Sequence, residues 1–246
     1  MNFCQEFYVE DIYLVPASLF EKFNKISKAP FSTFYRLDKK YLLSASPERF
    51  LKKEGNQLIS QPIKGTIKRG ETTKENKQLT QQLFESKKDR SENIMIVDLV
   101  RNDLSRTCLP GTVQVKELFG IYPFEQVNHL ISTITGTLAP SMDFADALKN
   151  AFPMGSMTGA PKIRSMELIE QYEQSKRGLY SGAVGYITPK GDFDFNVIIR
   201  SMLYDASSRY LSFQVGGAIV NDSIPILEYE ECLLKVAGIR RALCKS

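Results

Sequence analysis

Residues 181–217 read SGAVGYITPKGDFDFNVIIRSMLYDASSRYLSFQVGG, and the fold class follows from this segment. Its runs of apolar and β-branched residues predict three strands, over 181–189, 194–205 and 209–217, with Pro, Gly, Asp and Ser in the turns between them. Strands that follow one another without a helix pair antiparallel, because a parallel pair needs a long crossover connection. The segment therefore predicts an α+β fold with antiparallel sheets rather than a parallel βαβ sheet.

The rest of the chain also alternates helical and strand patterns. Apolar residues at helical spacing predict helices over 16–27, 71–86, 91–106, 143–152, 161–172 and about 225–242. Further strands are predicted over 31–37, 41–46, 112–122 and 126–138. The helix at 91–106 is expected to bury Ile94, Met95, Val97, Leu99, Val100 and Leu104. Residues 61–70, QPIKGTIKRG, are expected to form a loop that carries Lys64.

Composition excludes several classes of protein. The chain has 246 residues, 43% of them hydrophobic, without a linker or repeat, so one continuous domain over 1–246 is expected. Its 32 basic and 28 acidic residues are interspersed and leave no basic stripe for nucleic acid. No apolar run reaches the roughly 18 residues of a membrane span, and the start MNFCQEFYVED lacks signal-peptide features, which favours a cytoplasmic protein. Four cysteines without a CxxC pair suggest neither disulfides nor zinc.

Two acidic pairs occur on predicted helices that are far apart in sequence. Asp89 with Glu92, and Glu228 with Glu231, are each three residues apart and therefore share a helix face. Such a pair can be a solvated first turn favoured by the helix dipole. It can also serve Mg²⁺, which takes carboxylate oxygens from one or two residues and fills its remaining positions with water or substrate. The spacing alone leaves both readings open.

Several segments could bind an anion. GSMTGAPK, with Thr158 and Lys162, opens a predicted helix whose free N–H groups attract negative charge. VGGAIVNDS has Gly216 and Gly217, which allow either a close backbone approach or a simple strand-end turn. Arg200 lies in an apolar strand and needs a partner, which can be a substrate carboxylate or an internal acid.

His129, the only histidine, lies among apolar residues in VNHLIST. A hydrogen-bonded core histidine and a proton-handling histidine both fit this position, because the ordinary pKa of imidazole is near neutrality. In VRNDLSR, Arg101 and Asp103 pose the same choice as Arg200, between a substrate contact and an internal partner, and there a structural role is favoured.

Six motifs together resemble one known family. PIKGT, ENIMIVDLVRNDLSR, GSMTGAPKIRSMELI, SGAVGY, IIRSM and GGAIVNDSIPILEYEECLLK occur in the order and rough spacing of the chorismate-utilising enzymes, over about residues 3–240. The resemblance implies two orthogonally packed antiparallel sheets flanked by helices, in four layers, α/β/β/α. It also implies chorismate as substrate and Mg²⁺ as cofactor.

The resemblance also implies roles for the residues singled out above. Glu92 and Glu231 would bind Mg²⁺ at the ring carboxylate of chorismate, with Asp89 and Glu228 supporting the metal and its waters. The enolpyruvyl carboxylate would be held by Tyr186, Arg200 and the backbone N–H groups around Gly216 and Gly217. The other carboxylate end would be served by Thr158 and Lys162, and His129 would lie near the hydroxyl that leaves ring carbon 4.

Lys64 separates the branches of this family. The anthranilate and isochorismate enzymes usually have alanine there, whereas the aminodeoxychorismate enzymes resemble this chain in having PIKGT. A lysine amine can add to ring carbon 2 and form a covalent adduct, after which ammonia attacks carbon 4. The amine must be neutral to do so, and Glu48 in SPERF matches the family carboxylate suited to acid and base work there. A loop lysine that points to solvent is the alternative.

The resemblance leads to expectations about partners and extent. One histidine leaves no glutaminase pattern, so ammonia is expected from a glutamine amidotransferase subunit. The chain opens inside the family's first motif, so we expect a single catalytic domain over 1–246 without the family's N-terminal region and without tryptophan regulation. Alternative functions are anthranilate or isochorismate formation from the same substrate, and a non-catalytic chorismate-binding subunit.

Overall fold

The computed structural model describes residues 1–125, 127–221 and 223–244. Its chain forms two compact units, and each of them is assembled from segments that are far apart in sequence. The first unit contains residues 1–48, 163–184 and the described part of 196–246, and the second unit contains residues 49–162 and 185–195. The expectation of one catalytic domain over 1–246 stays a prediction.

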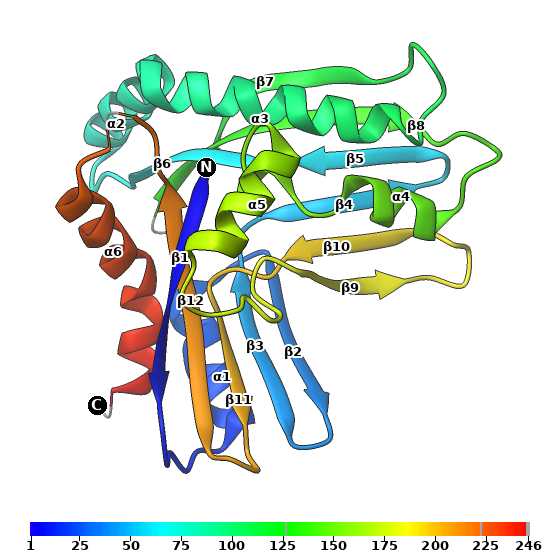
Figure 1. Ribbon diagram of the computed structural model, residues 1–246. Helices are drawn as coiled ribbons and strands as arrows, with labels where there is room; N and C mark the ends of the chain where they lie inside the picture. The colour runs from blue at the N-terminus through cyan, green and yellow to red at the C-terminus, as the bar shows by residue number, and fades with distance from the viewer. Residues whose placement is uncertain (126, 222, 245–246) are drawn as a thin grey trace. The chain divides into compact units, whose positions relative to one another are not determined.

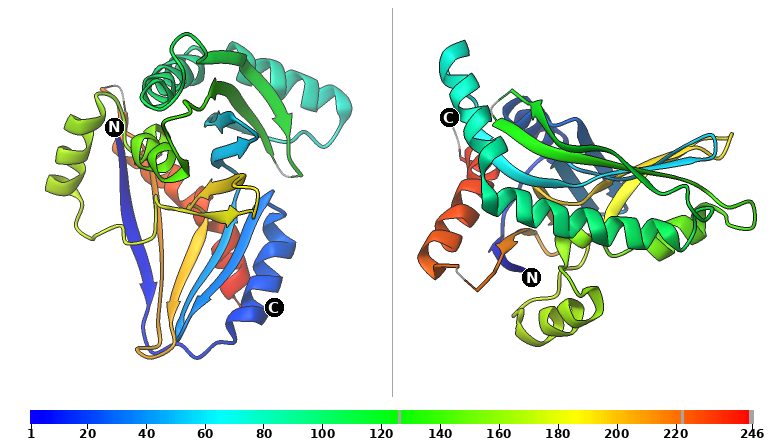
Figure 2. Two further views of the ribbon diagram at one scale, coloured as in Figure 1. Left: turned by 90° about the vertical axis from the view of Figure 1, so that its right-hand side faces the viewer. Right: turned by 90° about the horizontal axis from the view of Figure 1, so that it is seen from above.

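A five-stranded sheet forms the centre of the first unit, in the order β1-β12-β11-β3-β2 (Figure 1). Its strands are β1 (Asn2–Val9), β2 (Phe31–Leu37), β3 (Lys40–Ser46), β11 (Ser201–Asp205) and β12 (Tyr210–Ala218). All four pairings are antiparallel. Helices α1 (Pro16–Ser27) and α6 (Pro225–Leu243) cover one face of this sheet (Figure 2). Phe23 of α1 and Ile239 of α6 join Leu43 and Leu211 of the sheet in one buried cluster.

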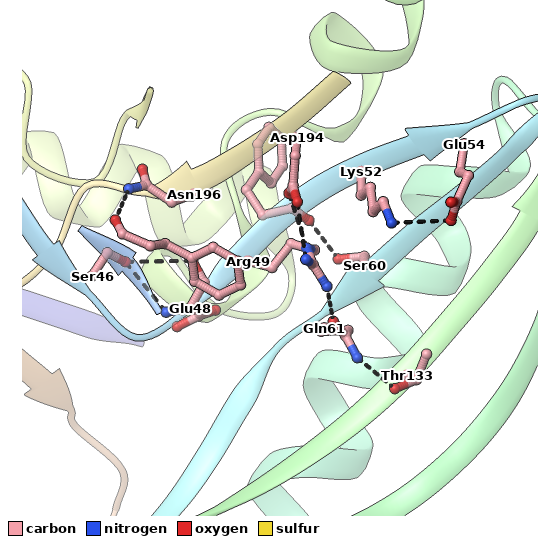
Figure 3. A network of polar contacts seen from close by, with 12 residues as sticks. Ser46, Glu48, Arg49, Lys52, Glu54, Ser60, Gln61, Thr133, Asp194 and Asn196 are labelled. Carbon is pink, nitrogen blue, oxygen red and sulfur yellow. Dashed lines mark hydrogen bonds and ion pairs between the residues drawn. The ribbon is translucent and has the colours of Figure 1, made fainter. Parts of the chain in front are cut away.

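The second unit contains a seven-stranded sheet, in the order β6-β8-β5-β4-β10-β9, with β7 also paired to β8. Its strands are β4 (Arg49–Glu54), β5 (Gln57–Gln61), β6 (Ile63–Lys68), β7 (Gln114–Pro123), β8 (Val127–Thr137), β9 (Ala183–Ile187) and β10 (Phe193–Val197). The Arg49 guanidinium makes two bonds of 2.9 Å to Asp194 and one of 2.5 Å to Gln61 (Figure 3). The two-bond contact with Asp194 and the bond to Gln61 together tie three neighbouring strands, β5, β4 and β10, to one another.

Side-chain caps determine where the helices of the second unit begin. The helices of this unit are α2 (Thr73–Glu85), α3 (Lys87–Ser105), α4 (Phe144–Ala151) and the short 3₁₀ helix η1 (Gly155–Met157). Helix α5 (Lys162–Tyr172) follows them in the chain. The Thr72 hydroxyl accepts the N–H of Glu75, and the Ser86 hydroxyl accepts the N–H of Asp89. Ser86 therefore ends α2 and caps α3, which fixes the first turn of α3. None of the helices in the described part of the chain is long and apolar enough to cross a membrane.

The predicted α+β class with antiparallel sheets is confirmed. The helix predicted over 16–27 is confirmed at both ends. The orthogonal packing and the four-layer order stay predictions. The prediction of one strand over 194–205 is wrong, because Arg200 has a φ of +51° and divides that segment into β10 and β11.

Two further expectations are wrong. Lys64 lies in strand β6 rather than in a loop, because Ile63 and Thr66 on either side of it pair with β8 across a bulge. On α3, Ile94 is 45% exposed, whereas Asn93 and Ile96 are buried. The buried stripe includes the polar Asn93 because its Oδ1 accepts a 2.6 Å hydrogen bond from Ser132 of β8.

Candidate functional site

Lys64 lies on a bulge of β6. Ile63 pairs with Ile131 of β8 and Thr66 pairs with His129, so three steps along β6 face two steps along β8. Gly65 has a φ of +99°, and a Cβ added there would lie 3.1 Å from the Cβ of Asp89. The bulge therefore needs glycine at 65, where the chain lies against the first turn of α3, and the neighbouring Lys64 is half-buried.

His129 lies on β8 beside this bulge. Its side chain is buried, and its Nδ1 is joined to the hydroxyl of Thr66 by a 2.8 Å hydrogen bond. The edge of its ring also packs against Phe124, with 4.8 Å between the ring centroids. Because Thr66 follows Lys64 by two residues, the histidine and the lysine belong to one local cluster on neighbouring strands. The structure thus shows a hydrogen-bonded, buried histidine on the strand that pairs with the one carrying Lys64.

The first acidic pair lies in the first turns of α3. Asp89 and Glu92 are both half-buried. Among the described residues, no hydrogen-bond partner reaches the buried Oε1 of Glu92. A buried carboxylate oxygen without a donor is costly, and a bound cation would relieve that cost. The donor set at this turn therefore fits a hard divalent ion.

The second acidic pair lies at the start of α6, in the first unit. The hydroxyl of Ser223 donates a 2.7 Å hydrogen bond to Glu228 Oε1, and the Lys235 ammonium lies 2.5 Å from Glu231 Oε1. Lys235 also donates to the carbonyl of Gly216, at 2.8 Å. Lys235 was not among the predicted site residues, although its position four residues after Glu231 is the spacing of a helical ion pair.

The two acidic pairs belong to different units. Glu92 is in the second unit and Glu231 is in the first. Within the residues that the structure describes, no three His, Cys, Asp or Glu side chains gather as a metal site. Each pair by itself offers the one or two carboxylates that Mg²⁺ takes from a protein, so the implied cofactor fits the chemistry of both turns.

The two candidate glycines of β12 serve different purposes. A Cβ on Gly216 would lie 1.9 Å from the carbonyl oxygen of Phe3, so the pairing of β12 with β1 demands glycine there. A Cβ on Gly217 would lie 3.4 Å from Glu228 Oε2 and 3.9 Å from Glu231 Oε1. The backbone at Gly217 thus lies against the acidic turn of α6, where a ligand could approach it.

Arg200 lies between β10 and β11 and is half-buried. Among the described residues, no hydrogen bond or ion pair to its guanidinium is found. Burial lowers the pKa of Arg200, while Tyr180 and Glu231 nearby act to raise it. A guanidinium keeps its charge in proteins, so this one is a desolvated cation suited to binding a carboxylate. Tyr180, which is buried, is a neighbour that the sequence analysis missed.

Thr158 and Lys162 lie in the segment that joins α4 to α5. The buried Thr158 hydroxyl donates to the carbonyl of Met154 at 3.0 Å. The Lys162 ammonium lies 2.6 Å from Asp103 Oδ2 on α3. The structural role favoured for Asp103 is therefore supported by a buried ion pair, and no sequence signal linked these two residues.

The last two candidates differ in their surroundings. Glu48 follows β3 and is 5% exposed. Its N–H donates to the hydroxyl of Ser46 at 3.3 Å (Figure 3). Its carbonyl accepts the N–H of Val197 at 3.1 Å, and the two bonds fix its backbone. Tyr186 on β9 is 64% exposed.

Comparison with known proteins identifies the class. The chain belongs to the family of chorismate binding enzymes, which matches residues 1–241. It is 45% identical over 224 residues to aminodeoxychorismate synthase component 1 of Salmonella typhimurium, an alignment of 91% of this chain and 49% of that protein. The protein of the same name from Escherichia coli is 42% identical over 226 residues, with 92% and 49% covered. The chain thus spans about half the length of these curated relatives.

A solved structure agrees with this assignment. Anthranilate synthase component I from Streptococcus pneumoniae superposes with a TM-score of 0.87 at 32% identity, covering 96% of this chain and 52% of that one. The fold of the chain is therefore the fold of this family.

Proposed function

We propose that the chain is the chorismate-converting part of an aminodeoxychorismate synthase. It would replace the hydroxyl at ring carbon 4 of chorismate by an amino group, in the cytoplasm, with ammonia from a glutamine amidotransferase subunit. The names of the relatives at 45% and 42% identity support this reaction. The observation that carries the proposal is the half-buried Lys64 on the bulge of β6, one residue before the Gly65 that lies against α3 and two before the Thr66 that bonds to His129.

Lys64 is proposed as the nucleophile. Its neutral amine forms a C–N bond to ring carbon 2, the ring double bonds shift, and the C4–O bond breaks. The departing hydroxyl takes a proton and leaves as water. Ammonia then bonds to carbon 4, the double bonds shift back, and the C2–N bond breaks to restore the lysine amine.

Two residues are proposed to move the protons. Glu48 accepts the proton that the lysine nitrogen loses on attack, and it can return that proton to the departing hydroxyl. Its buried position and its fixed backbone support this role. His129 is proposed to contact the hydroxyl at carbon 4, and its bond to Thr66 fixes the ring orientation.

The remaining candidates are proposed to hold the substrate. Arg200 and Tyr186, with the backbone at Gly216 and Gly217, would bind the enolpyruvyl carboxylate, and the segment that carries Thr158 and Lys162 would bind the other end. The carboxylates of Glu92, Glu231, Asp89 and Glu228 would hold Mg²⁺. When bound, the metal withdraws electron density from the ring through its carboxylate and so eases addition at carbon 2.

A second function has a specific observation in its favour. The structural match to an anthranilate synthase component I supports the same ring chemistry with a different product. Isochorismate formation would need water as the nucleophile, and a non-catalytic subunit would bind chorismate without turnover. Lys64 distinguishes the aminodeoxychorismate reaction from these alternatives, because direct attack by ammonia or water at carbon 2 does not require a lysine.

The test is a mass-spectrometric product analysis. The full chain is incubated with chorismate, Mg²⁺ and an ammonium salt, which replaces the amidotransferase. Lys64→Ala is expected to lower formation of aminodeoxychorismate at least about 10³-fold, because it removes the nucleophile. Lys68→Ala is the matched control, since Lys68 is exposed on the same strand and its ammonium lies 3.7 Å from Glu75 Oε1.

Each outcome has a distinct meaning. Aminodeoxychorismate from the parent and from the Lys68 variant, with none from the Lys64 variant, is the expected result. Anthranilate or isochorismate from the parent would overturn the proposed product. Chorismate that is bound but unchanged would favour the non-catalytic subunit.

A further inference from the structure

The Asp103–Lys162 ion pair is among the most enclosed pairs of charges in the second unit. Their side chains are only 4% and 13% exposed, and the 2.6 Å contact joins the last turns of α3 to the start of α5. Desolvation raises the pKa of Asp103, although the ammonium of Lys162 opposes this change. Among the described residues, the other carboxylate oxygen of Asp103 has no hydrogen-bond partner. Asp103 therefore depends on Lys162 for its compensation.

Lys162 also touches the end of the preceding helix. Its ammonium lies 3.4 Å from the carbonyl oxygen of Ala151, the last residue of α4. One ammonium thus joins both ends of the segment 152–161 to Asp103. The ammonium has three hydrogens, and two of them are directed to these acceptors.

The middle of the same segment is held by α3 as well. A Cβ added to Gly155 would lie 2.6 Å from the Leu99 side chain, so the backbone of η1 lies directly on the helix. Leu99 and Asp103 are four residues apart and share a face of α3. Between these two attachments, the buried Thr158 bonds to Met154 within the segment. The position of Thr158 thus depends on one packing contact and one ion pair.

We infer that Lys162 acts on the reaction through Asp103, as a positioning residue that fixes segment 152–161 and Thr158, and not by contact of its ammonium with the substrate. This inference rests on the proposed function only where its test measures turnover of chorismate. Lys162 is thus a residue that holds segment 152–161 in place rather than a substrate contact, and Asp103 has the same role.

The test compares Lys162→Met, Asp103→Leu and the double variant Asp103→Leu/Lys162→Met. A support made by an ion pair can be replaced by two apolar side chains of similar volume, whereas a substrate contact cannot. Each single variant is expected to raise the KM for chorismate by roughly 10- to 100-fold with a smaller change in kcat, because Thr158 is misplaced. The double variant is expected to return to within about threefold of the parent. Asp98→Asn and Lys149→Met, both exposed in the same unit, are the matched controls.

Binding and stability are measured alongside turnover. In calorimetric titration with Mg²⁺ present, the affinity for chorismate is expected to fall in each single variant and to recover in the double variant. The melting temperature is expected to change in the same way. A double variant as poor as Lys162→Met, or an Asp103→Leu variant that binds chorismate normally, would overturn the inference. If the variants show this pattern of binding but the parent forms no aminated product, the proposed function is contradicted and the inference is still supported.

Discussion

Gly65 shows how one residue can control a candidate catalytic group. Its φ of +99° is a conformation that other residues adopt only with strain, and it directs the bulge that carries Lys64. Three side chains, from Leu83, Asp89 and Leu130, each lie 3.1 Å from the position that a Cβ would take. Backbone strain and crowding therefore both oppose any side chain at this position.

Gly65→Ala is expected to destabilise the protein by about 2–5 kcal/mol, from roughly 1–2 kcal/mol of backbone strain and 1–3 kcal/mol of overpacking. Denaturant unfolding measures this change. Gly111→Ala is the matched control, since Gly111 has a φ of +79° with no atom within 4 Å of its added Cβ. It is expected to cost only the strain. Equal losses in the two variants would contradict the packing of the bulge against α3.

The sequence predicted some residues of the site better than others. The two acidic pairs followed from a spacing of three residues, because helical geometry alone puts them on one face. Gly216 was a candidate for ligand approach, yet the carbonyl of Phe3 explains it, and that neighbour is more than 200 positions away in the chain. Contacts of this kind leave no local pattern, which is also why the pairing of Lys162 with Asp103 was not foreseen.

At the scale of elements, the segment after α5 is held by a buried ion pair. The Arg177 guanidinium donates three hydrogen bonds to Glu173, at 2.6, 2.9 and 3.2 Å, and also bonds to the hydroxyl of Ser181 and the carbonyl of Asn2. Glu173 in turn accepts the N–H of Cys4 at 2.9 Å. The pair thus ties the end of α5 to β1 and to the turn that enters β9.

Arg177→Met is expected to lower the free energy of unfolding by about 3–5 kcal/mol, because it leaves the buried Glu173 carboxylate without a counter-charge. Arg164→Met is the control, since Arg164 pairs with Glu167 in the exposed part of α5, where such a pair contributes at most about 1 kcal/mol. Urea unfolding of both variants measures the difference. A loss below about 1 kcal/mol in Arg177→Met would show that the pair is not needed.

Helix prediction succeeded where the apolar period was regular, as in α1, and strand prediction failed where the backbone leaves the ordinary regions. Arg200 at a φ of +51° ends a run of β-branched residues that reads as one strand. Strands β4 and β6 carry several lysines and a glycine, so apolar and polar residues alternate only weakly along them. Their conformation is decided by long-range pairing, of β4 with β5 and of β6 with β8.

At the scale of the whole molecule, the cysteines report on both units. Burial raises the pKa of Cys108 in the second unit to about 11 and that of Cys4 in the first to about 12, and it also raises that of Cys232. Cys244 is exposed near the end of α6. Because the thiolate is the reactive form, the buried thiols are nearly all protonated at pH 8.

Iodoacetamide at pH 8 is therefore expected to modify Cys244 first in the folded protein, with the other three thiols at least about tenfold slower. Their rates are expected to rise as the pH rises toward their raised pKa values. Peptide mass mapping over time measures each rate, and Cys244→Ser should remove the fast phase. Rapid modification of Cys108 would show that the second unit opens readily.

The interleaving of the two units has a consequence for how the chain folds as it is synthesised. Asn2 pairs with Ala218, so β1 emerges from the ribosome long before its partner strand exists. At about 5–20 residues per second this delay is roughly 10–40 s. The second unit has most of its residues between 49 and 162 and can begin to collapse during that interval. A strand that is made early is thus secured late, and β1 is the segment that a nascent-chain chaperone would have to shield until β12 is made.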